Sequence, residues 1–236
     1  MIILYQPPGA WGSPSVSPFC IKLELYLKMA GLPYEVQPAD MRCAPRGKVP
    51  FVSIDAGPLL ADSQVIIEEL KRRYGNPLDA RLNADQRARG HLVRRTLEEA
   101  TYFASLYLRW GRDSGYAETS RVFRSFLPAP LALLLPLIRR RVRASLWGQG
   151  TGRLSEDEIC EAAIADWTAV SRVLGGSTHL LGDLPSSYDA TLYAFLEALL
   201  CFPVGSPVQA HVQATENLVA YHARMKGRWF PRSQRG

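Results

Sequence analysis

The sequence contains few cysteines and few histidines, four of each in 236 residues. The cysteines form no Cys-x-x-Cys pair, so neither a disulfide framework nor a zinc motif is predicted. The histidines show no ligand spacing and no paired acid, and no metal site is expected. A chain of this length can bury a core large enough to need neither cross-link. The four cysteines are Cys20, Cys43, Cys160 and Cys201, and the four histidines are His91, His179, His211 and His222.

Long apolar runs are also missing. The longest nearly uncharged run, over 126–138, has 13 residues and three prolines, whereas a transmembrane helix needs about 20 residues. No membrane-spanning helix is therefore expected. Met1 leads directly into a strand-like apolar stretch, so no signal peptide is expected either. The unpaired cysteines then favour a reducing, cytoplasmic location.

Acidic residues are absent from one basic segment. The chain has a formal net charge of +6, and residues 121–143 carry six arginines and no acid. The excess charge is thus local, and because no recognised binding motif accompanies it, no nucleic-acid partner is expected. A solvated helix face is the default interpretation. Weak contact with an anionic membrane surface is the alternative, through Arg139, Arg140, Arg141 and Arg143.

The first 75 residues alternate short apolar strands with helices. The spacing of apolar side chains in the first helix predicts that Lys22, Glu24 and Lys28 are exposed. A βαβ half followed by a ββα half is typical of the thioredoxin-like fold, because a parallel pair needs a crossover helix and an antiparallel pair only a turn. Strands are predicted at 2–6, 34–37, 49–54 and 59–60, and helices at 18–30 and 62–74.

No strand is predicted beyond residue 84. The polar stretch 76–83 is a reasonable linker. We therefore expect an α/β thioredoxin-like domain over 1–76 and an all-α domain over 84–236. Helices are predicted at 84–110, 115–126, 131–146, 155–174, 186–200 and 207–226.

The first candidate site is Ser17-Pro18, at the start of the first predicted helix. Serine suits the N-cap and proline the first helical position. A hydroxyl held at this positive end of the helix would donate a hydrogen bond to a thiolate and favour its ionised form. For a single Ser-Pro pair, a plain helix cap is the simpler interpretation.

Two further motifs follow. In Lys48-Val49-Pro50, the proline begins an inner strand, where it cannot donate to the sheet and often marks a cis bond or a sheet edge. A cis turn would present the Val49 backbone to a peptide-like ligand, with the Lys48 cation beside it. In Asp62-Ser63, the Ser63 amide at a helix start would bind a carboxylate, and Asp62 would accept from an amino group. Taken singly, these motifs are ordinary strand entries and helix caps.

The order and spacing of the three motifs resemble the glutathione S-transferase superfamily. The resemblance implies a thioredoxin-like N-terminal domain, an all-helical C-terminal domain and glutathione as co-substrate. The candidate residues that it implies are Ser17 for the glutathione thiol, Val49 and Pro50 for the cysteinyl backbone, Asp62 and Ser63 for the γ-glutamyl end, and Lys48 for the glycine carboxylate.

A finer resemblance extends over nearly the whole chain. Residues 17–24 with 29–34, and residues 149–153 followed by Ser155 and Glu158, are similar to the failed-axon-connections and metaxin branch of the superfamily. Residues 181–189 resemble the capping box of the helical domain, in which Asp189 bonds back to Ser186. Some members of that branch act as adaptors or as components of membrane complexes. A non-catalytic adaptor or membrane-associated binding protein is therefore the alternative function.

The leading interpretation is a cytoplasmic glutathione transferase of the serine type, in which the thiolate attacks an electrophilic small molecule. The resemblance implies a homodimer formed through the helices at 62–74 and 84–110. It also implies an electrophile pocket at the Trp11 loop and the aromatic helix, including Tyr102 and Phe103.

Other residues compete with Ser17. The loop over 7–17 is long and also holds Ser13, while Tyr5 lies near the place where other transferase classes keep a catalytic tyrosine. Ser17 is preferred because an apolar helix follows it directly. Cys20 stands where a Cys-x-x-Cys motif has its second cysteine, so a thiol–disulfide reductase is a third interpretation. We expect Cys20 to be a buried helix residue rather than a nucleophile.

Overall fold

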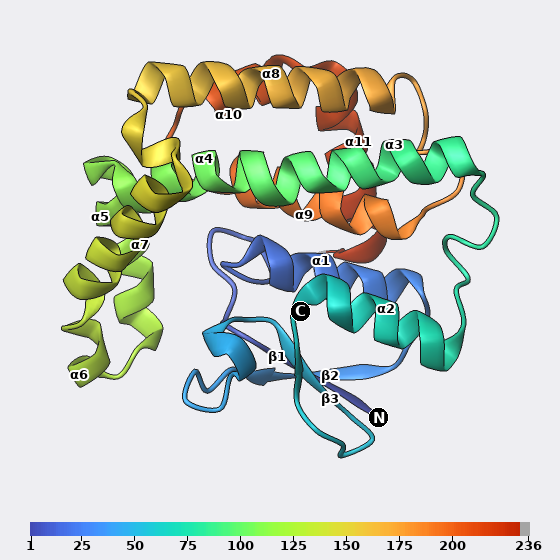
Figure 1. Cartoon of the computed structure of the whole chain (residues 1–236), viewed down its shortest axis with the longest axis horizontal. Coiled ribbons are helices and arrows are strands. Elements are labelled where there is room, and N and C mark those ends of the chain that lie inside the picture. The colour runs from blue at the N-terminus through green and yellow to red at the C-terminus, as the bar shows by residue number, and fades with distance from the viewer. Residues whose placement is uncertain (232–236) are drawn as a thin grey trace.

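The computed structural model of the chain describes residues 1–231. Figure 1 shows a β-sheet covered by two helices, with a layer of further helices stacked on these two. The sheet has the strand order β2-β1-β3-β4. The strands are β1 (Ile2–Gln6), β2 (Tyr34–Pro38), β3 (Phe51–Ile54) and β4 (Leu60–Ala61), and the two covering helices are α1 (Pro18–Met29) and α2 (Ser63–Tyr74).

The sheet confirms the predicted thioredoxin-like fold. β1 runs parallel to β2, whereas β1 and β3, and β3 and β4, are antiparallel pairs. β3 begins two residues later than predicted, because Pro50 cannot donate to the sheet. Asp55 and Ala56 adopt left-handed backbone conformations between β3 and β4. This turn reverses the chain within a few residues, as an antiparallel pair allows.

The helical part of the chain begins with a long, continuous helix, in which π-helical turns over Thr96–Thr101 and Tyr107–Gly111 follow α3 and α4. Two predicted helices are each divided. The predicted helix at 131–146 is interrupted at residues 133–134, and the one at 207–226 at Thr215. The helices are α3 (Ala84–Arg95), α4 (Tyr102–Leu106), α5 (Asp113–Phe126), α6 (Ala129–Ala132), α7 (Leu135–Gln149), α8 (Glu156–Leu174), α9 (Ser187–Leu200), α10 (Pro207–Ala214) and α11 (Glu216–Trp229).

Helix α1 is covered on both sides. It packs on the sheet and α2 with one face and on α9 with the other (Figure 1). Lys22 and Glu24 are only 0% and 8% exposed, so the prediction that they face solvent was wrong. The helical spacing of apolar residues did not reveal this second covering layer. The domain boundaries 1–76 and 84–236 stay a prediction, because one hydrophobic core runs through both halves.

The buried ammonium group of Lys22 joins the two halves of the chain. It donates to Glu98 Oε1 at 2.5 Å and to Gln64 Oε1 at 2.8 Å. Arg94 Nη1 donates to the other oxygen of Glu98 at 3.1 Å. Burial lowers the pKa of Lys22, and the neighbouring Glu98 opposes this shift. The ion pair therefore connects α1 to the long helix, and the hydrogen bond to Gln64 connects α1 to α2.

The predicted capping box at the start of α9 is confirmed. The Asp189 carboxylate is completely buried and accepts from both the amide and the hydroxyl of Ser186, at 2.8 and 2.7 Å. It also accepts from the amide of Leu180 at 2.7 Å and from the hydroxyl of Tyr221 at 3.0 Å. One carboxylate thus fixes the start of α9, the preceding loop and α11.

The α5–α7 arm (residues 113–149) extends to one side of the molecule (Figure 1). Arg139 turns back toward the body of the protein and donates to the carbonyl oxygens of Trp110 and Gly111, at 3.0 and 2.8 Å. It also pairs with Asp113. Arg139 therefore does not belong to an exposed basic surface, in contrast to the three arginines named with it. No helix within residues 1–231 is both long enough and apolar enough to span a bilayer.

Candidate functional site

The sheet register brings the three sequence motifs to one end of the sheet. Tyr5 lies opposite Phe51, and Phe51 lies opposite Ala61. Pro50, which precedes Phe51, and Asp62, which follows Ala61, are therefore neighbours. The loop that leaves β1 toward Ser17 starts at the same end. The local order of strands and helices is thus sufficient to assemble the candidate site.

Ser17 is the N-cap residue of α1, and Pro18 holds the first helical position. The Ser17 side chain makes no capping hydrogen bond, and the residue is half-buried. Its amide instead donates to Ser15 Oγ at 3.3 Å. The hydroxyl is therefore held at the positive end of a helix while it remains able to donate to a ligand.

The two competitors of Ser17 are differently placed. Ser13 is buried, and its hydroxyl donates to the Ser15 carbonyl oxygen at 3.2 Å. Tyr5 stacks on Phe51 with ring centroids 4.8 Å apart. Because side chains alternate along a strand, Tyr5 lies on the opposite face of β1 from Leu4, which is completely buried in the core. Ser17 is thus the competitor at a helix start; its hydroxyl makes no capping hydrogen bond and lies beside the Cys20 thiol.

The peptide bond between Val49 and Pro50 is cis. Pro50 is buried, Val49 is half-buried and Lys48 is exposed. Since β3 begins only at Phe51, the Val49 backbone lies outside the strand pairing and is available to a peptide-like ligand. The exposed Lys48 ammonium can swing toward an anionic group bound there.

Asp62 and Ser63 form the start of α2. Asp62 is the N-cap, with a left-handed φ of 81°. One of its carboxylate oxygens, Oδ1, accepts from the amides of Gln64 and Val65 at 3.0 and 3.3 Å. The other oxygen remains available for an amino group. Ser63 is the first helical residue and is buried, and its amide has no intrahelical acceptor.

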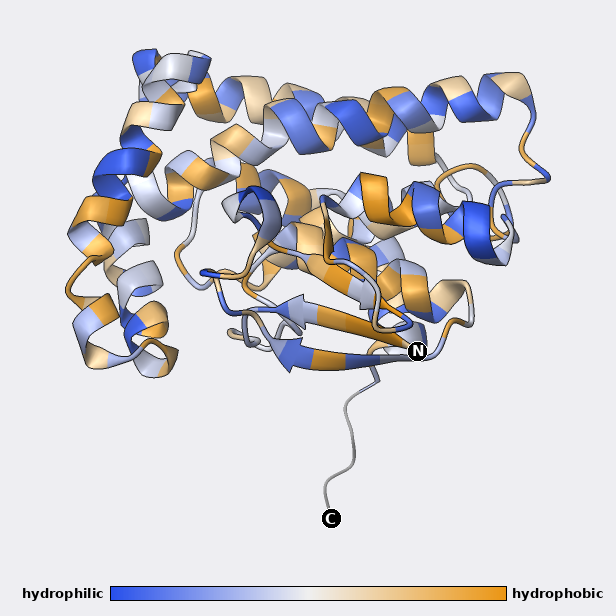
Figure 2. Cartoon of the chain, turned by 60° about the horizontal axis from the view of Figure 1, so that its bottom comes forward, coloured by the Kyte–Doolittle hydropathy of each residue, from blue (hydrophilic) through white to orange (hydrophobic). Residues whose placement is uncertain are grey.

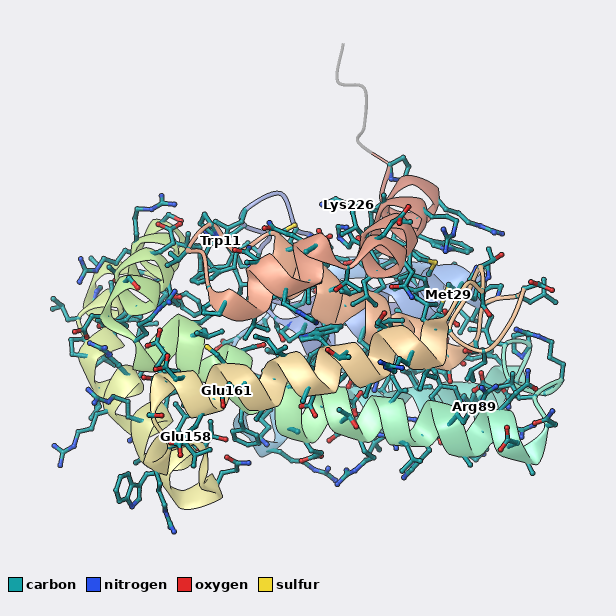
Figure 3. All side chains as sticks on the ribbon, turned by 90° about the horizontal axis from the view of Figure 1, so that it is seen from above. Trp11, Met29, Arg89, Glu158, Glu161 and Lys226 are labelled. Carbon is teal, nitrogen blue, oxygen red and sulfur yellow. The ribbon has the colours of Figure 1, made fainter. Side chains whose placement is uncertain are left out.

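The three residues predicted for the electrophile pocket do not form one cluster of direct contacts. Trp11 Nε1 donates to Glu118 Oε1 of the arm at 2.6 Å, and Figure 3 shows Trp11 beside the arm. The Tyr102 ring packs edge-on against Phe19 and Phe103, with centroids 5.0 and 5.3 Å apart. The pocket assignment stays a prediction.

Arg109 contacts Trp11 and the loop before Ser17, and the sequence did not single it out. Its guanidinium lies 5.0 Å from the centroid of the Trp11 ring, and Nη1 donates to the Val16 carbonyl oxygen at 2.9 Å. The only sign in the sequence was a charged residue next to the aromatic stripe that ends at Trp110.

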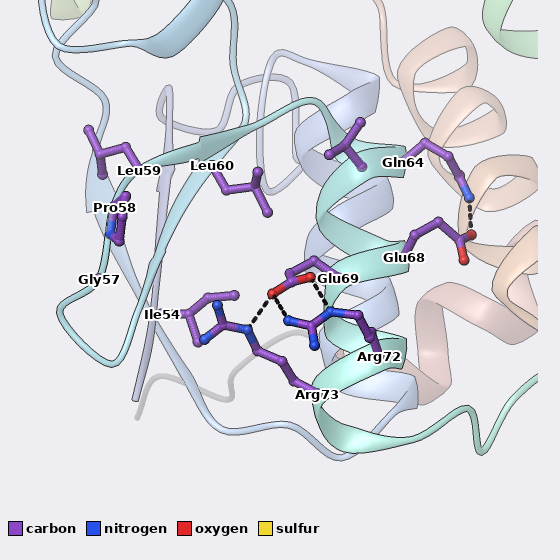
Figure 4. Close-up of a pocket in the computed structure, with 11 residues that line it drawn as sticks. Ile54, Gly57, Pro58, Leu59, Leu60, Gln64, Glu68, Glu69, Arg72 and Arg73 are labelled. Atoms are coloured by element: carbon purple, nitrogen blue, oxygen red, sulfur yellow. Dashed lines mark hydrogen bonds and ion pairs between the residues drawn. The ribbon is translucent and has the colours of Figure 1, made fainter.

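A separate groove of about 600 Å³ lies between α2 and the turn after β3 (Figure 4). Its apolar wall includes Leu59, Leu60 and Val65, and its other side is charged. There Glu69 pairs with both Arg72 and Arg73. Because Ser17 and the Val49–Pro50 turn are not among its lining residues, this groove is distinct from the candidate thiol site.

The thiols of the chain have contrasting surroundings. Cys20 is completely buried. Burial raises the pKa of the Cys20 thiol to about 12, and hydrogen bonds from Ser17 and Ser15 offset only part of the shift. Burial likewise raises the pKa of Cys201 to about 11. Cys43 is exposed. In residues 1–231, no group of three His, Cys, Asp or Glu side chains is placed to hold a metal ion.

We expect Cys20 to resist modification in the folded protein, because the thiolate is the reactive form and a raised pKa leaves very little of it at neutral pH. Titration with dithionitrobenzoate should modify Cys43 rapidly and Cys20 only after denaturant is added. In a Cys43→Ala control, the fast phase should disappear. Rapid native modification of Cys20 would instead support the reductase interpretation.

Comparison with known protein families gives two matches. A model of the glutathione S-transferase N-terminal domain matches residues 18–115, and a model of the glutathione S-transferase C-terminal domain matches residues 163–225. The isoprene-epoxide–glutathione S-transferase of Rhodococcus sp. (strain AD45) is 33% identical over 234 residues, covering 96% of this chain and 98% of that protein.

Relatives from the predicted branch are also found. Failed axon connections of Drosophila melanogaster is 30% identical and covers 98% of this chain, but only 58% of that protein is matched. Metaxin-1 of Mus musculus is 27% identical, covering 95% of this chain and 74% of that protein. Among solved structures, a glutathione S-transferase of Methylobacterium radiotolerans in complex with glutathione sulfonate superposes with a TM-score of 0.62 and 17% identity, covering 96% of this chain and 91% of the other.

Proposed function

The chain belongs to the glutathione S-transferase family, and we propose that it is a glutathione transferase of the serine type. The observation that carries the proposal is the Ser17 hydroxyl at the start of α1, which makes no capping hydrogen bond and lies at the same end of the sheet as the cis Val49–Pro50 turn and the start of α2. A donor hydrogen bond from Ser17 stabilises the thiolate of bound glutathione, which lowers the pKa of that thiol.

The remaining groups of glutathione find matching partners. The γ-glutamyl carboxylate binds the free amide and hydroxyl of Ser63 at the positive end of α2, and its ammonium group binds Asp62. The cysteinyl backbone pairs with Val49 beside Pro50. The exposed Lys48 attracts the glycine carboxylate. Two carboxylates and one amine are thus each met by a group of opposite charge or by a helix terminus.

The proposed substrate is an electrophilic small molecule, and an epoxide is the first class to test because of the 33% identical relative named for isoprene epoxide. The glutathione thiol first gives its proton to solvent. The thiolate then attacks an epoxide carbon, so that a C–S bond forms while the C–O bond breaks. The resulting alkoxide takes a proton from water. The protein contributes the stabilised thiolate and the orientation of the two reactants.

Calorimetry with glutathione, combined with a conjugation assay on epoxides and a generic aromatic electrophile, tests this proposal. Binding with turnover supports the transferase. Binding without turnover over the whole panel would favour the second candidate, a glutathione-binding adaptor, for which the similarity to failed axon connections and metaxin-1 is the supporting observation. An absence of glutathione binding would contradict the site assignment.

We further propose a homodimer formed through α2 and the long helix. The groove against α2 has an apolar wall and a rim of both charges, which suits a self-complementary contact with a second copy. Val65→Arg, in the groove wall, should convert the dimer to a monomer in sedimentation experiments. Val219→Arg on α11, a residue of similar exposure, should leave the dimer intact. A monomeric wild-type chain would contradict the proposal.

We also propose that the arm contacts anionic membrane surfaces weakly. Leu133 is 80% exposed, and three other leucines at the α6 end of the arm are exposed by nearly half. This end appears orange in Figure 2. Arg140, Arg141 and Arg143 on α7 are exposed and have no ion-pair partner among residues 1–231. Apolar side chains next to unpaired cations suit the boundary between lipid headgroups and acyl chains.

The double substitution Arg140→Gln/Arg141→Gln should weaken binding to phosphatidylserine-containing vesicles by about 30-fold, since each such charge contributes about 1 kcal/mol near an anionic surface. Co-sedimentation with vesicles measures this. Arg172→Gln/Arg228→Gln, which removes two exposed arginines outside the arm, should leave vesicle binding unchanged. Equal losses in both variants would mean that only the net charge matters.

A further inference from the structure

Arg109 is a half-buried cation whose Nε atom is buried, and the described part of the chain offers it no carboxylate partner. It lies in the turn Tyr107–Gly111, near the end of the long helix. Its guanidinium lies next to the rings of Trp11 and Phe202, 5.0 and 5.5 Å from their centroids, and the two rings contact each other edge-on. Such stacking stabilises an arginine, but it does not neutralise the charge. Removing an arginine from water without a counter-ion costs free energy of folding, which suggests that the charge of Arg109 serves a purpose at this position.

The hydrogen bonds of Arg109 point to the β1–α1 loop. Nη1 donates to the carbonyl oxygen of Val16 at 2.9 Å, and Val16 immediately precedes Ser17. Nε has no acceptor within residues 1–231. The cavity beside it has a volume of about 10 Å³, which is about the room that one water molecule needs. The cavity is therefore too small for a group of the substrate, and the direct target of the guanidinium is the loop that carries Ser17.

Neighbouring charged groups do not cancel Arg109. From α5, Glu118 is engaged with Trp11 Nε1 and Arg121. From α11, Lys226 donates to the carbonyl oxygen of Gly12 in the same loop, but Glu197 accepts from it. From α4, Tyr102 faces Arg109 as a phenol whose pKa burial raises, so it is neutral at pH 7. The pKa of Arg109 falls to about 10 through burial, which leaves it protonated at neutral pH.

We infer that Arg109 is a positioning residue for the thiol site: it holds the backbone next to Ser17 through Val16, and its unbalanced charge stabilises the thiolate of glutathione bound there. This inference rests on the proposed function. A positive charge within a few ångströms of an acid favours the ionised form, and it does so strongly where water is excluded. The long helix thereby contributes to a site otherwise built by the first half of the chain.

The test replaces the charge and follows the thiol of bound glutathione by its thiolate absorbance as the pH is raised. Arg109→Gln, a neutral hydrogen-bond donor, should raise the apparent thiol pKa by about one unit. At a pH below the thiol pKa of both the wild type and the variant, kcat should fall about tenfold while KM for glutathione changes little. Arg109→Lys, which keeps the charge, should restore most of the shift. The thermal unfolding midpoint of each variant shows whether it is folded.

Arg112 provides the matched control. It lies three residues further along, but it pairs with Glu156 at 3.3 Å and donates to the Gly205 carbonyl oxygen at 2.9 Å. Arg112→Gln should leave the thiol pKa unchanged. Equal shifts of the thiol pKa in both Gln variants would overturn the proposed role of Arg109. No pKa shift in Arg109→Gln while glutathione still binds would do the same, and either result would leave the proposed transferase function standing. Equal loss of activity in Arg109→Gln and Arg109→Lys without a shift would show a purely structural role. A wild-type chain that binds no glutathione overturns both proposals.

Discussion

Ser17→Ala should reduce turnover at neutral pH about 100-fold, the loss typical when one donor to a developing or stabilised anion is removed. Glutathione should still bind with little change in affinity, because the proposed contacts of Asp62, Ser63 and Val49 remain. The apparent thiol pKa of bound glutathione should rise in the variant. A pH titration of the thiolate absorbance and of kcat measures both effects in one experiment.

The controls for this prediction are Ser13→Ala and Tyr5→Phe. The Ser13 hydroxyl is already committed to a backbone carbonyl, and Tyr5 stacks on Phe51. Both variants should therefore keep turnover close to that of the wild type. If either abolishes turnover while Ser17→Ala remains active, the serine-type assignment to Ser17 is wrong. Restored activity in Ser17→Thr would show that the hydroxyl, rather than the local backbone, is what matters.

Asp189→Ala should be the most destabilising single substitution among those discussed. The buried carboxylate accepts from Leu180, Ser186 and Tyr221, and hydrogen bonds to a charged group contribute about 1.5–3 kcal/mol each. Because such losses are not additive, we expect the free energy of unfolding to fall by about 4 kcal/mol. The midpoint of thermal unfolding should then fall by about 10 °C.

The capping box of α8 is the natural comparison. Ser155 and Glu158 form the same reciprocal pair of bonds, but on the surface. Glu158→Ala should cost about 1 kcal/mol, the usual value of a cap in contact with water. If denaturant unfolding gives equal losses of unfolding free energy for Asp189→Ala and Glu158→Ala, then burial and the additional donors around Asp189 contribute nothing beyond an ordinary cap.

Local sequence patterns predicted most of the thioredoxin-like half and the capping box. Pro50 restricts the backbone where β3 begins, Gly57 permits the tight turn after β3, and Asp189 lies three residues after its N-cap partner. Each of these signals acts over a few residues. The break at residues 133–134 was missed although Pro136, in the first turn of α7, marks it. The break at Thr215 was missed because no proline or glycine marks it, and it depends on how the last helices pack.

The candidate site was predictable only where its residues lie at the ends of elements. Pro50 and Asp62 are neighbours because the register of the sheet places those ends together, and the loop toward Ser17 leaves β1 at the same end. Arg109 lies on a helix that is distant in sequence, and its proposed role depends on its contact with the β1–α1 loop. Likewise, the inward turn of Arg139 depends on carbonyl oxygens freed at the end of the long helix. Contacts of this kind have no periodicity that a sequence pattern can reveal.

The Lys22–Glu98 pair limits how this chain could exchange parts with its relatives. A chimera that joins residues 1–76 to the helical half of another family member would enclose the Lys22 ammonium group opposite whatever residue replaces Glu98. An apolar replacement would leave a buried charge unpaired, which costs about 3–5 kcal/mol. Recombination at the linker therefore succeeds only when lysine and acid are inherited together. The two halves behave as a matched pair rather than as interchangeable modules.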